Sequence, residues 1–474
     1  MNTDIKWFVT ASVIMLVGCM SDATRTLDLA EKELGTDGSI TMHYHSALYY
    51  PEKIALQDGG YLVGIEKGYP GKIFKEEERI QFKDHGTKNE EVIERQKTVQ
   101  DNKIMFVSHV IHDQFPGAAA KNCTVYNAYY RGGSKSPPPP IRPCIDEVQP
   151  KPAEVKKVAE GAYISSWQAL DALQDRLSRD IATSEYTHIL VVVMGWNTVQ
   201  EEAVRNINSI VRGIKHAAKG SGGKNVFEPL VIGVTWPSQW NSVWLDPLYK
   251  LASFDTKARD ADEVGLTWLG VLLEKTIPQA NSLSGRHLPV IAIGHSFGAR
   301  ALNTAACLGP VISNGVVTEA YAKQTIDLVI NYQGAFLIDH LLGEASGIEF
   351  KMTERCPSVK SIALTSAERD TAVDTAIWGK YAGNDTGFKK YCAKPAAGIN
   401  CVIANPEGGI DTGSVAVGGV TYIDASDLIF YNAFYTGGGS HSDIYRDEHG
   451  VLSWSLIKKL AANNDDLRTT KKVP

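Results

Sequence analysis

A single serine stands between two glycines in the segment Gly294-His295-Ser296-Phe297-Gly298, where an apolar run ends and an alanine-rich run begins. A serine hydroxyl is a poor nucleophile unless it is exposed, aligned with a base and placed beside donors that stabilise an oxyanion. A sharp turn from a strand into a helix supplies this setting, and its crowded, strained tip needs small neighbours. The sequence therefore predicts Ser296 as the nucleophile of an acyl transfer, with Gly294 and Gly298 as the glycines of the turn.

The pattern Gly-x-Ser-x-Gly is weak by itself, because a chain with 42 glycines in 474 residues can contain it by chance. Its context is more specific. Residues Pro289–Gly294 have the length and apolarity of a buried strand, and residues 299–306 are good helix formers. The structural alternative is a tight glycine turn in a helix-on-sheet core, with an incidental serine.

The base that activates such a serine is expected after it in the chain, in the order Ser, acid, His. Three histidines follow Ser296, namely His340, His441 and His449. His441 lies in a glycine-rich segment after the last expected strand, as a catalytic histidine requires. His340 follows an earlier strand, and His449 lies in a charged stretch typical of a solvated turn. We therefore expect His441 to be the base.

The acid is expected at the end of the strand that includes Ile362–Thr365. Asp370 follows this strand closely, where its carboxylate can orient His441 through the Nδ1–H group. Asp339, after the preceding strand, and Glu368 are the alternatives. Asp370 also has a structural alternative, which is to cap a helix N-terminus.

From about residue 160, expected helices alternate with apolar runs that read as strands buried on both faces of a parallel sheet. This pattern predicts a doubly wound α/β domain, in which ligands bind at the carboxyl ends of the strands. The expected strands are His188–Asn197, Pro229–Ser238, Pro289–Gly294, Ile326–Gly334, Val359–Ser366 and Gly419–Asp424.

Three helices are expected, one before the first of these strands and one after each of the first two. Ser165 and Ser166 resemble a capping box, which predicts that a helix begins there. Thr198 is expected to cap the next helix, which Gly220 ends, and a further helix is expected over Asp260–Thr276.

The N-terminal part, residues 41–155, is expected to be a strand-rich extension of the α/β domain, which spans residues 156–474. Its clearest strands are Lys103–Ile111 and Thr124–Tyr130. Pro137–Pro140 can form neither a helix nor a central strand, so they predict a polyproline II loop on the surface.

The chain starts with features of an export signal. Lys6 precedes the twelve-residue apolar run Trp7–Gly18, which is too short to span a bilayer but suits a signal peptide. Residues 16–19, Leu-Val-Gly-Cys, resemble the lipobox of bacterial lipoproteins. This resemblance implies that residues 1–18 are removed, that Cys19 is lipidated and that residues 19–40 form a tether. Cys19 is followed by Met20 and Ser21 rather than by Asp, which favours the outer membrane over the inner. The alternatives are an ordinary cleaved signal or a chance apolar start.

Six further cysteines are an even number, which allows disulfides in an exported chain, with 15 connectivities. Sequence proximity favours Cys123–Cys144 and Cys392–Cys401, which leaves Cys307–Cys356. The alternative for Cys307 is a buried, unbonded thiol in an apolar helix.

The net charge of −6, with the basic residues spread along the chain, gives no footprint for nucleic acid. His43 and His45 would lie on one face of a strand, and His109 and His112 are a similar pair. Neither pair has a visible third ligand, so we expect no metal and no other cofactor. Trp236, Trp240 and Trp244 could line an acyl pocket, although core packing is the favoured role.

Five segments, in this order, are similar to those of a largely uncharacterised bacterial family of α/β-hydrolases, whose members carry Val-His-Gly-Tyr/Phe-Asn, Ser-Trp-Pro-Ser and Gly-His-Ser-Met-Gly. The resemblance covers roughly residues 160–465. The segments are Val191–Asn197, Thr235–Trp240, Gly294–Leu302, Thr365–Val373 and Gly438–Tyr445.

The resemblance implies an α/β-hydrolase fold, with a mostly parallel central sheet flanked by helices. It also implies that Ser296, Asp370 and His441 are nucleophile, acid and base. The peptide N–H groups of Phe297 and Trp196 would form the oxyanion hole. Gly195 would let the backbone approach the nucleophile.

The sequence departs from the family pattern at two places. Met194 stands where the family has histidine, which predicts altered pocket geometry rather than lost chemistry. The second departure is an insertion at about residues 376–418, between Asp370 and His441, which we expect to act as a lid or as part of the substrate wall.

Together these features predict an exported, lipid-anchored serine hydrolase of the lipase or esterase type. Its substrate would be a small-molecule or lipid acyl ester, and it would contact the membrane through the lipidated Cys19. Two alternatives stay open, namely a thioesterase or amidase with the same triad, and a non-catalytic envelope scaffold or binding protein.

Overall fold

The structure is a computed structural model that describes residues 55–67, 103, 105–113, 122–128, 141–148, 158–195, 198, 200–222, 226–236, 258–314, 324–342, 351–372, 381–415, 417–431 and 440–461. The expected signal peptide (residues 1–18), tether (residues 19–40) and polyproline run (Pro137–Pro140) lie outside the described residues.

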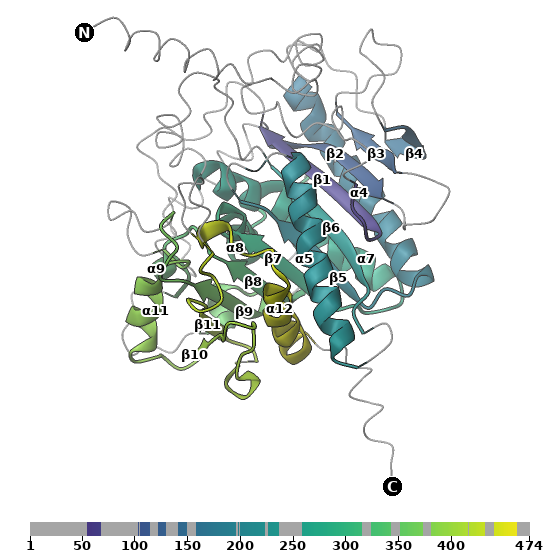
Figure 1. The fold of residues 1–474 in the computed structure, drawn as a ribbon. Helices are drawn as coiled ribbons and strands as arrows, with labels where there is room; N and C mark the ends of the chain where they lie inside the picture. The colour runs from purple at the N-terminus through teal and green to yellow at the C-terminus, as the bar shows by residue number, and fades with distance from the viewer. Residues whose placement is uncertain are drawn as a thin grey trace, which may run out of the picture.

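A single sheet runs through the described part of the chain (Figure 1). Its strands are β1 (Gly60–Lys67), β2 (Met105–Asp113), β3 (Cys123–Asn127), β4 (Pro143–Val148), β5 (His188–Val193), β6 (Pro229–Thr235), β7 (Val290–His295), β8 (Ile326–Tyr332), β9 (Val359–Ser366), β10 (Ile399–Ile403) and β11 (Val420–Asp424). They lie in the order β10-β11-β9-β8-β7-β5-β6-β1-β2-β3-β4. All neighbouring pairs are parallel except β1–β2 and β2–β3.

The central strands are apolar along their whole length because both faces of the sheet are covered. In β5, Val191 and Val193 belong to the core on one face, whereas Leu190 and Val192 belong to the core on the other. This alternation follows from the two-residue period of a strand. The uninterrupted apolar runs of the sequence therefore correspond to strands between two helical layers, as predicted.

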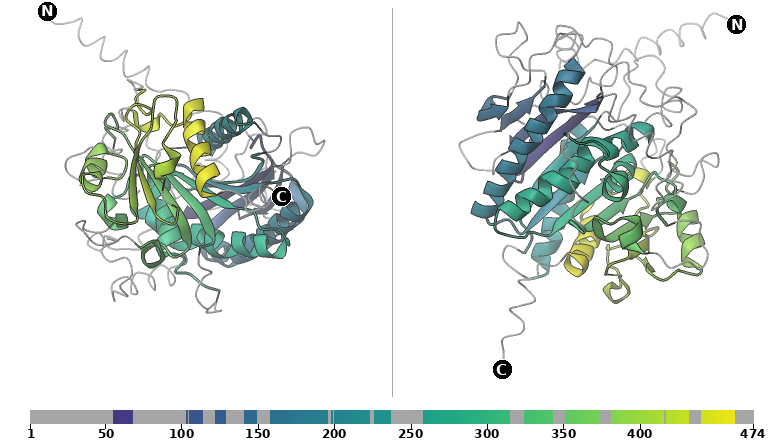
Figure 2. Two further views of the ribbon diagram at one scale, coloured as in Figure 1. Left: turned by 90° about the horizontal axis from the view of Figure 1, so that it is seen from below. Right: turned by 180° about the vertical axis from the view of Figure 1, so that it is seen from behind.

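Helices form a layer on each face of the sheet, as the views in Figures 1 and 2 show. On one face lie α5 (Gln200–Gly220) and α12 (Asp447–Leu460), and on the other lie α4 (Val158–Thr183), α7 (Ile277–Leu283) and α8 (Phe297–Leu308). A helical stretch over residues 258–264 continues through two π-helical turns, Gly265–Leu269 and Leu272–Thr276, into α7. Shorter helices are α9 (Ile338–Leu342), α10 (Met352–Arg355) and α11 (Asp385–Cys392).

Helix α4 begins before the predicted capping box, so that prediction is wrong. Ser165 and Ser166 lie inside the helix, where their hydroxyls donate to the carbonyls of Gly161 (3.0 Å) and Ala162 (2.6 Å). The Ser166 hydroxyl also accepts a hydrogen bond from the backbone N–H of Val107 on β2 (2.8 Å). These serines therefore serve the helix interior and a tertiary contact rather than a helix start.

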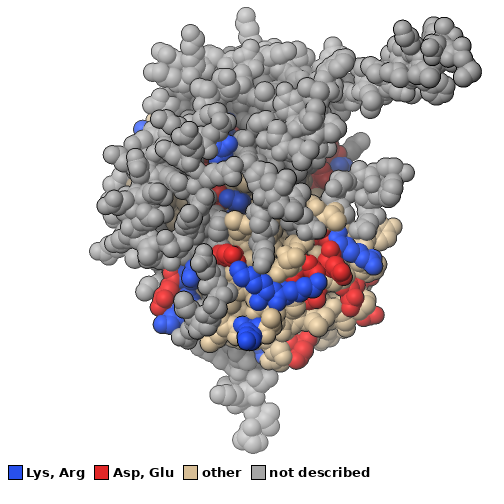
Figure 3. All heavy atoms as spheres, turned by 90° about the vertical axis from the view of Figure 1, so that its left-hand side faces the viewer, with Lys and Arg blue, Asp and Glu red and all other residues tan. Residues whose placement is uncertain are grey.

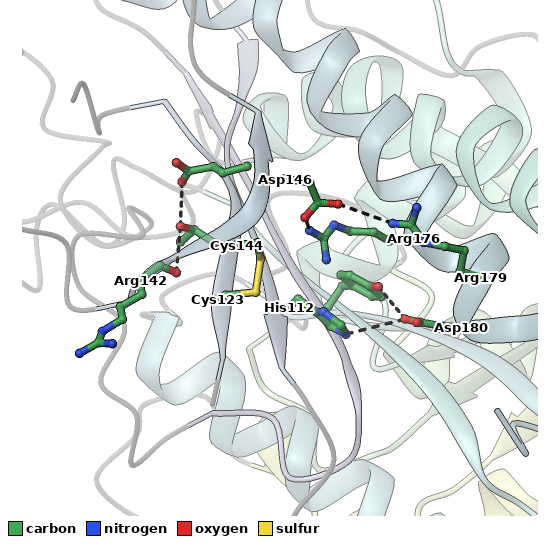
Figure 4. Close-up of a disulfide and its surroundings, with 11 residues drawn as sticks. His112, Cys123, Arg142, Cys144, Asp146, Arg176, Arg179 and Asp180 are labelled. Carbon is green, nitrogen blue, oxygen red and sulfur yellow. Dashed lines mark hydrogen bonds and ion pairs between the residues drawn. A yellow bond between two sulfur atoms is a disulfide. The ribbon is translucent and has the colours of Figure 1, made fainter. Parts of the chain in front are cut away.

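The N-terminal strands continue the sheet of the α/β part. β1 pairs in parallel with β6, and β2 to β4 follow outward from β1. At this edge a disulfide joins Cys123 on β3 to Cys144 on β4, and Arg176 on α4 forms an ion pair with Asp146 on β4 (Figure 4). The edge strands are thus bonded both to each other and to the helix that covers them.

Two further disulfides fix the other half of the described fold. One joins Cys307, near the end of α8, to Cys356, which precedes β9. The other joins Cys392, at the end of α11, to Cys401 on β10. Cys123–Cys144 and Cys392–Cys401 are the two pairings that sequence proximity favours, and Cys307–Cys356 is the pair that they leave.

The expected insertion at residues 376–418 extends the sheet in its described part. β10 is an edge strand that pairs in parallel with β11, and the short 3-10 turn Thr412–Ser414 follows it. Helix α11 packs beside these strands, and on this side of the molecule Lys389 pairs with Asp385 of the same helix. Figure 3 shows that acidic and basic side chains are interspersed on this face.

None of the helices within the described ranges is both long enough and apolar enough to cross a bilayer. The apolar run Trp7–Gly18 lies outside those ranges.

Buried histidines make the stability of this fold sensitive to acid. Burial lowers the pKa of His109 and of His295 to about 3 and the pKa of His188 to about 4. In the unfolded chain these histidines bind a proton near pH 6.5, whereas in the folded chain they bind it only at pH 3 to 4. The free energy of unfolding therefore falls as the pH drops from about 6.5 to about 3. Glu274 acts oppositely, because burial raises its pKa to about 8 and the folded chain holds that proton more tightly.

We therefore expect the free energy of unfolding to fall by about 2–3 kcal/mol per pH unit between about pH 6 and pH 5, the net effect of roughly two protons. Urea unfolding at a series of pH values measures this slope. In a His109→Gln variant, the slope should be smaller by one proton, which is about 1.4 kcal/mol per pH unit. Stability that is flat or rises on acidification from pH 6.5 would contradict this account.

Candidate active site

The strand order reverses at β5, because β6 lies on one side of β5 and β7 on the other. In an open parallel sheet, such a reversal leaves a crevice at the carboxyl ends of the two strands, where ligands bind. Gly195 closely follows β5, and Ser296 directly follows β7. The fold therefore places the candidate nucleophile at the position where a doubly wound sheet binds its substrate.

Ser296 forms the turn between β7 and α8, with φ 56° and ψ −122°. A positive φ is uncommon for a residue with a side chain and is strained unless its neighbours impose it. Here the Ser296 N–H donates to the carbonyl of Tyr332 on β8 (3.0 Å), and the Ser296 carbonyl accepts from the N–H groups of Ala299 and Ala335 (both 3.1 Å). The end of β8 with the residues just after it, and the first turn of α8, thus hold the strained turn in place.

The two glycines of the turn are required by close backbone contacts. A Cβ atom on Gly298 would lie 2.2 Å from the carbonyl oxygen of Val193 on β5, and one on Gly294 would lie 2.6 Å from the Cα atom of Ala299. Both distances are far below van der Waals contact. The glycines therefore allow α8 to start directly against the ends of β5 and β7.

Gly195 closely approaches Ser296 from the neighbouring strand, since a Cβ atom there would lie 2.7 Å from the Cβ atom of Ser296. Met194 is buried in the core on the α5 side of the sheet, at the position where the family that the sequence resembles has histidine. The Met194 carbonyl accepts a hydrogen bond from Trp236 Nε1 (2.8 Å). The methionine therefore packs against the core, and Gly195 provides the close approach.

Of the two residues expected to form the oxyanion hole, one lies among the described residues. Phe297 is the first residue of α8, so its peptide N–H belongs to the first turn of a helix, where N–H groups gather partial positive charge. Trp196 lies outside the described residues. Their joint role stays a prediction.

Asp370 lies past the end of β9 and is fully buried. Its Oδ2 atom accepts hydrogen bonds from His441 Nδ1 (2.8 Å) and Gln333 Nε2 (2.7 Å), and its Oδ1 atom accepts one from the N–H of Ala372 (3.2 Å). With three donors, the side chain is held in a single orientation toward the histidine.

Gln333 was not singled out in the sequence, although it directly follows β8. It is buried, has a positive φ of 47°, and its Nε2 donates both to Asp370 and to the carbonyl of Gly383 (3.1 Å). Its Oε1 atom accepts a hydrogen bond from the Thr365 hydroxyl (3.0 Å). Gln333 therefore fixes the side chain of Asp370 from the position directly after β8. The sequence signal that could have identified Gln333 is a polar side chain at the carboxyl end of a buried strand.

His441 lies in the 3-10 turn Ser440–Ser442, and its ring is largely buried. Besides the bond from its Nδ1 to Asp370, the turn is held by a hydrogen bond from the N–H of Ser440 to the carbonyl of Arg369 (3.1 Å). The His441 ring centroid lies 4.9 Å from that of His295, the residue before Ser296. The structure thus brings the expected acid and base into contact and places the base beside the nucleophile turn.

The residues after His441 are anchored by Asp443. Its carboxylate accepts hydrogen bonds from the N–H groups of Phe430 (3.1 Å) and Tyr431 (2.9 Å) and from Arg446 Nε (2.7 Å). These donors, led by the Arg446 hydrogen bond, outweigh burial and lower the pKa of Asp443. The loop after β11 and the histidine turn are therefore connected through a single carboxylate.

The alternative acids and bases lie in different surroundings. Asp339 is partly exposed and accepts from Lys390 Nζ (2.8 Å) and the Tyr391 hydroxyl (2.5 Å), and Glu368 is exposed in a turn. His449 is buried in α12, where burial lowers its pKa to about 4. The side chain of His340 lies outside the described residues.

The other candidates of the sequence are less informative. Trp236 is a core residue, and Trp240 and Trp244 lie outside the described residues, as do His43 and His45. Across the described ranges, no group of three or more His, Cys, Asp and Glu side chains is arranged to hold a metal ion.

One comparison with known proteins gives a match. The model of a family described as an alpha/beta hydrolase of unknown function (DUF900) matches residues 169–270. No curated protein and no solved structure matches the chain. The matched segment contains β5, α5 and β6, but Ser296, Asp370 and His441 lie beyond it. This match and the mostly parallel sheet between two helical layers confirm the predicted α/β-hydrolase fold.

Proposed function

We propose that this chain is a serine hydrolase that cleaves carboxylic esters through Ser296, His441 and Asp370, by way of a covalent acyl-enzyme. The observation that carries the proposal is the 2.8 Å contact between His441 Nδ1 and the buried carboxylate of Asp370, beside the strained turn that holds Ser296. A buried acid that orients a histidine next to an elbow serine is the arrangement that acyl transfer requires.

In the acylation step, His441 Nε2 takes the proton from the Ser296 hydroxyl while the serine oxygen bonds to the ester carbonyl carbon. Asp370 accepts the Nδ1–H of His441 throughout, which fixes the tautomer and stabilises the imidazolium. His441 then gives its proton to the leaving alkoxide as the ester C–O bond breaks. Water repeats the sequence on the acyl-enzyme, which releases the carboxylic acid and restores the serine.

The negative charge that develops on the carbonyl oxygen needs donors in place beforehand. The N–H of Phe297, in the first turn of α8, and the N–H of Trp196, after Gly195, are proposed for this role. The support for this pair is the close approach of Gly195 to Ser296 and the position of Phe297 in the chain.

We also propose that the enzyme is exported and lipid-anchored through Cys19, with outer-membrane localisation favoured. The support is the apolar run Trp7–Gly18 followed by cysteine. Labelled palmitate should be incorporated into the wild type and not into Cys19→Ser. Equal incorporation into both would contradict the anchor.

Hydrolysis of p-nitrophenyl esters of increasing chain length tests the function. The wild type should hydrolyse at least part of the series, Ser296→Ala should lose this activity, and Ser178→Ala, which removes a partly exposed hydroxyl on α4, should retain it. The chain length of the best substrate separates an esterase from a lipase. A folded wild type that is inactive on every ester, with activity on thioesters or amides or with none, would overturn the proposal.

A further inference from the structure

We propose that His295 is a positioning residue, which holds the catalytic histidine in register with the serine through the main chain of His441. This inference rests on the proposed function. His295 ends β7 and directly precedes Ser296, so it belongs to the central strand that leads into the turn at Ser296. It therefore connects the base to the same strand that positions the nucleophile.

His441 needs such support because its own element is short. The 3-10 turn Ser440–Ser442 has three residues and cannot fix the position of a side chain by itself. On its amino side, the turn is held by the bond from Ser440 to Arg369, and on its carboxyl side by the contacts of Asp443. The carbonyl of His441 itself is held by His295 Nε2, at 3.0 Å.

The geometry determines the tautomer of His295. A carbonyl oxygen only accepts hydrogen bonds, so Nε2 carries the proton and donates it to His441. Nδ1 is then the unprotonated nitrogen, and it has no hydrogen-bond partner within the described residues. It faces Gly195, where a Cβ atom would lie 3.3 Å from it. The ring therefore fills the space between β5 and the histidine turn.

Two properties separate His295 from an alternative base. Its Nε2 is occupied as a donor, and its burial, with the nearby His441 as the second cause, lowers its pKa to about 3. The ring is consequently neutral throughout the working pH range. A neutral ring 4.9 Å from the His441 ring does not oppose the positive charge that His441 gains during each step.

Three substitutions test the role through the donor atom. His295→Gln keeps an N–H donor near the position of Nε2, His295→Asn places its amide near Nδ1 instead, and His295→Phe keeps the ring without a donor. Asn and Phe should lower kcat by about 10- to 100-fold with little change in KM, because a small misplacement of the base slows the chemical step. Gln should restore most of kcat. His109→Phe, at another buried histidine whose pKa is strongly lowered, lies four strands away and should leave kcat unchanged.

A measurement without substrate separates this inference from the proposed function. The proton that His441 Nδ1 shares with Asp370 should give a far-downfield NMR resonance, identified by its loss in Asp370→Asn. This resonance should be retained in His295→Gln and His109→Phe and be shifted or lost in His295→Asn and His295→Phe, with circular dichroism showing that each variant is folded. If the wild type lacks esterase activity, the proposed function fails and the resonance still decides the role of His295. An unchanged resonance and kcat in folded His295→Phe would overturn the inference.

Discussion

Replacing Asp370 with asparagine is expected to lower kcat by about 10³- to 10⁴-fold while KM changes little. Asp370 accepts from both His441 Nδ1 and Gln333 Nε2 on one oxygen, which an amide NH₂ group cannot do. If the asparagine keeps its oxygen on the N–H of Ala372, as Oδ1 of Asp370 does, its NH₂ group faces His441, and the histidine must present an unprotonated Nδ1. Its Nε2 then carries the proton and cannot accept the serine proton. Steady-state kinetics on an active ester measure the loss.

Asp339 provides the matched control, because it was the alternative acid in the sequence. Its carboxylate bonds to Lys390 and Tyr391 and is partly exposed, so Asp339→Asn should change kcat by no more than a few-fold. A large loss in Asp339→Asn together with a small loss in Asp370→Asn would assign the acid to α9, which follows β8, and contradict the site described above.

Replacing Ser296 with glycine is expected to abolish activity, by about 10⁵- to 10⁶-fold in kcat, and at the same time to stabilise the fold. The positive φ of Ser296 costs about 1–3 kcal/mol for a residue with a side chain, whereas glycine adopts it freely. The greater freedom of glycine in the unfolded chain offsets about 0.4–1 kcal/mol of this gain. The net increase in the free energy of unfolding should be about 1 kcal/mol, measured by urea unfolding.

Ser296→Ala separates the two effects, because alanine removes the hydroxyl but keeps the Cβ atom. It should be as inactive as Ser296→Gly and about as stable as the wild type. Equal stability of the glycine and alanine variants would show that the turn stores no strain that a Cβ atom causes.

Much of this fold follows from local patterns in the chain. The continuous apolar strands β5 to β9 and β11 were predicted near their observed positions, since burial on both faces leaves no room for polar residues. The turn at Ser296 was also predicted, because glycines at 294 and 298 are a local requirement of a strand that leads directly into a helix.

Other features depend on contacts between distant segments. The pairing of β1 with β6 joins residues that are far apart in sequence. The sequence of β1, GYLVGIEK, does not indicate which strand it pairs with. Ser166 resembled a helix cap but accepts from Val107 on β2. Gln333 holds Asp370 across two adjacent strands. Such roles are set by register and packing, which one sequence does not contain.

The most direct measurement is to treat the folded protein with a fluorophosphonate and to locate the adduct by peptide mass spectrometry. The account predicts one adduct, on Ser296, that is absent in Ser296→Ala and forms far more slowly in His441→Ala, because the phosphonate reacts only with a serine whose proton is removed. No adduct on the folded wild type, or an adduct on another residue at the same rate in both variants, would contradict it.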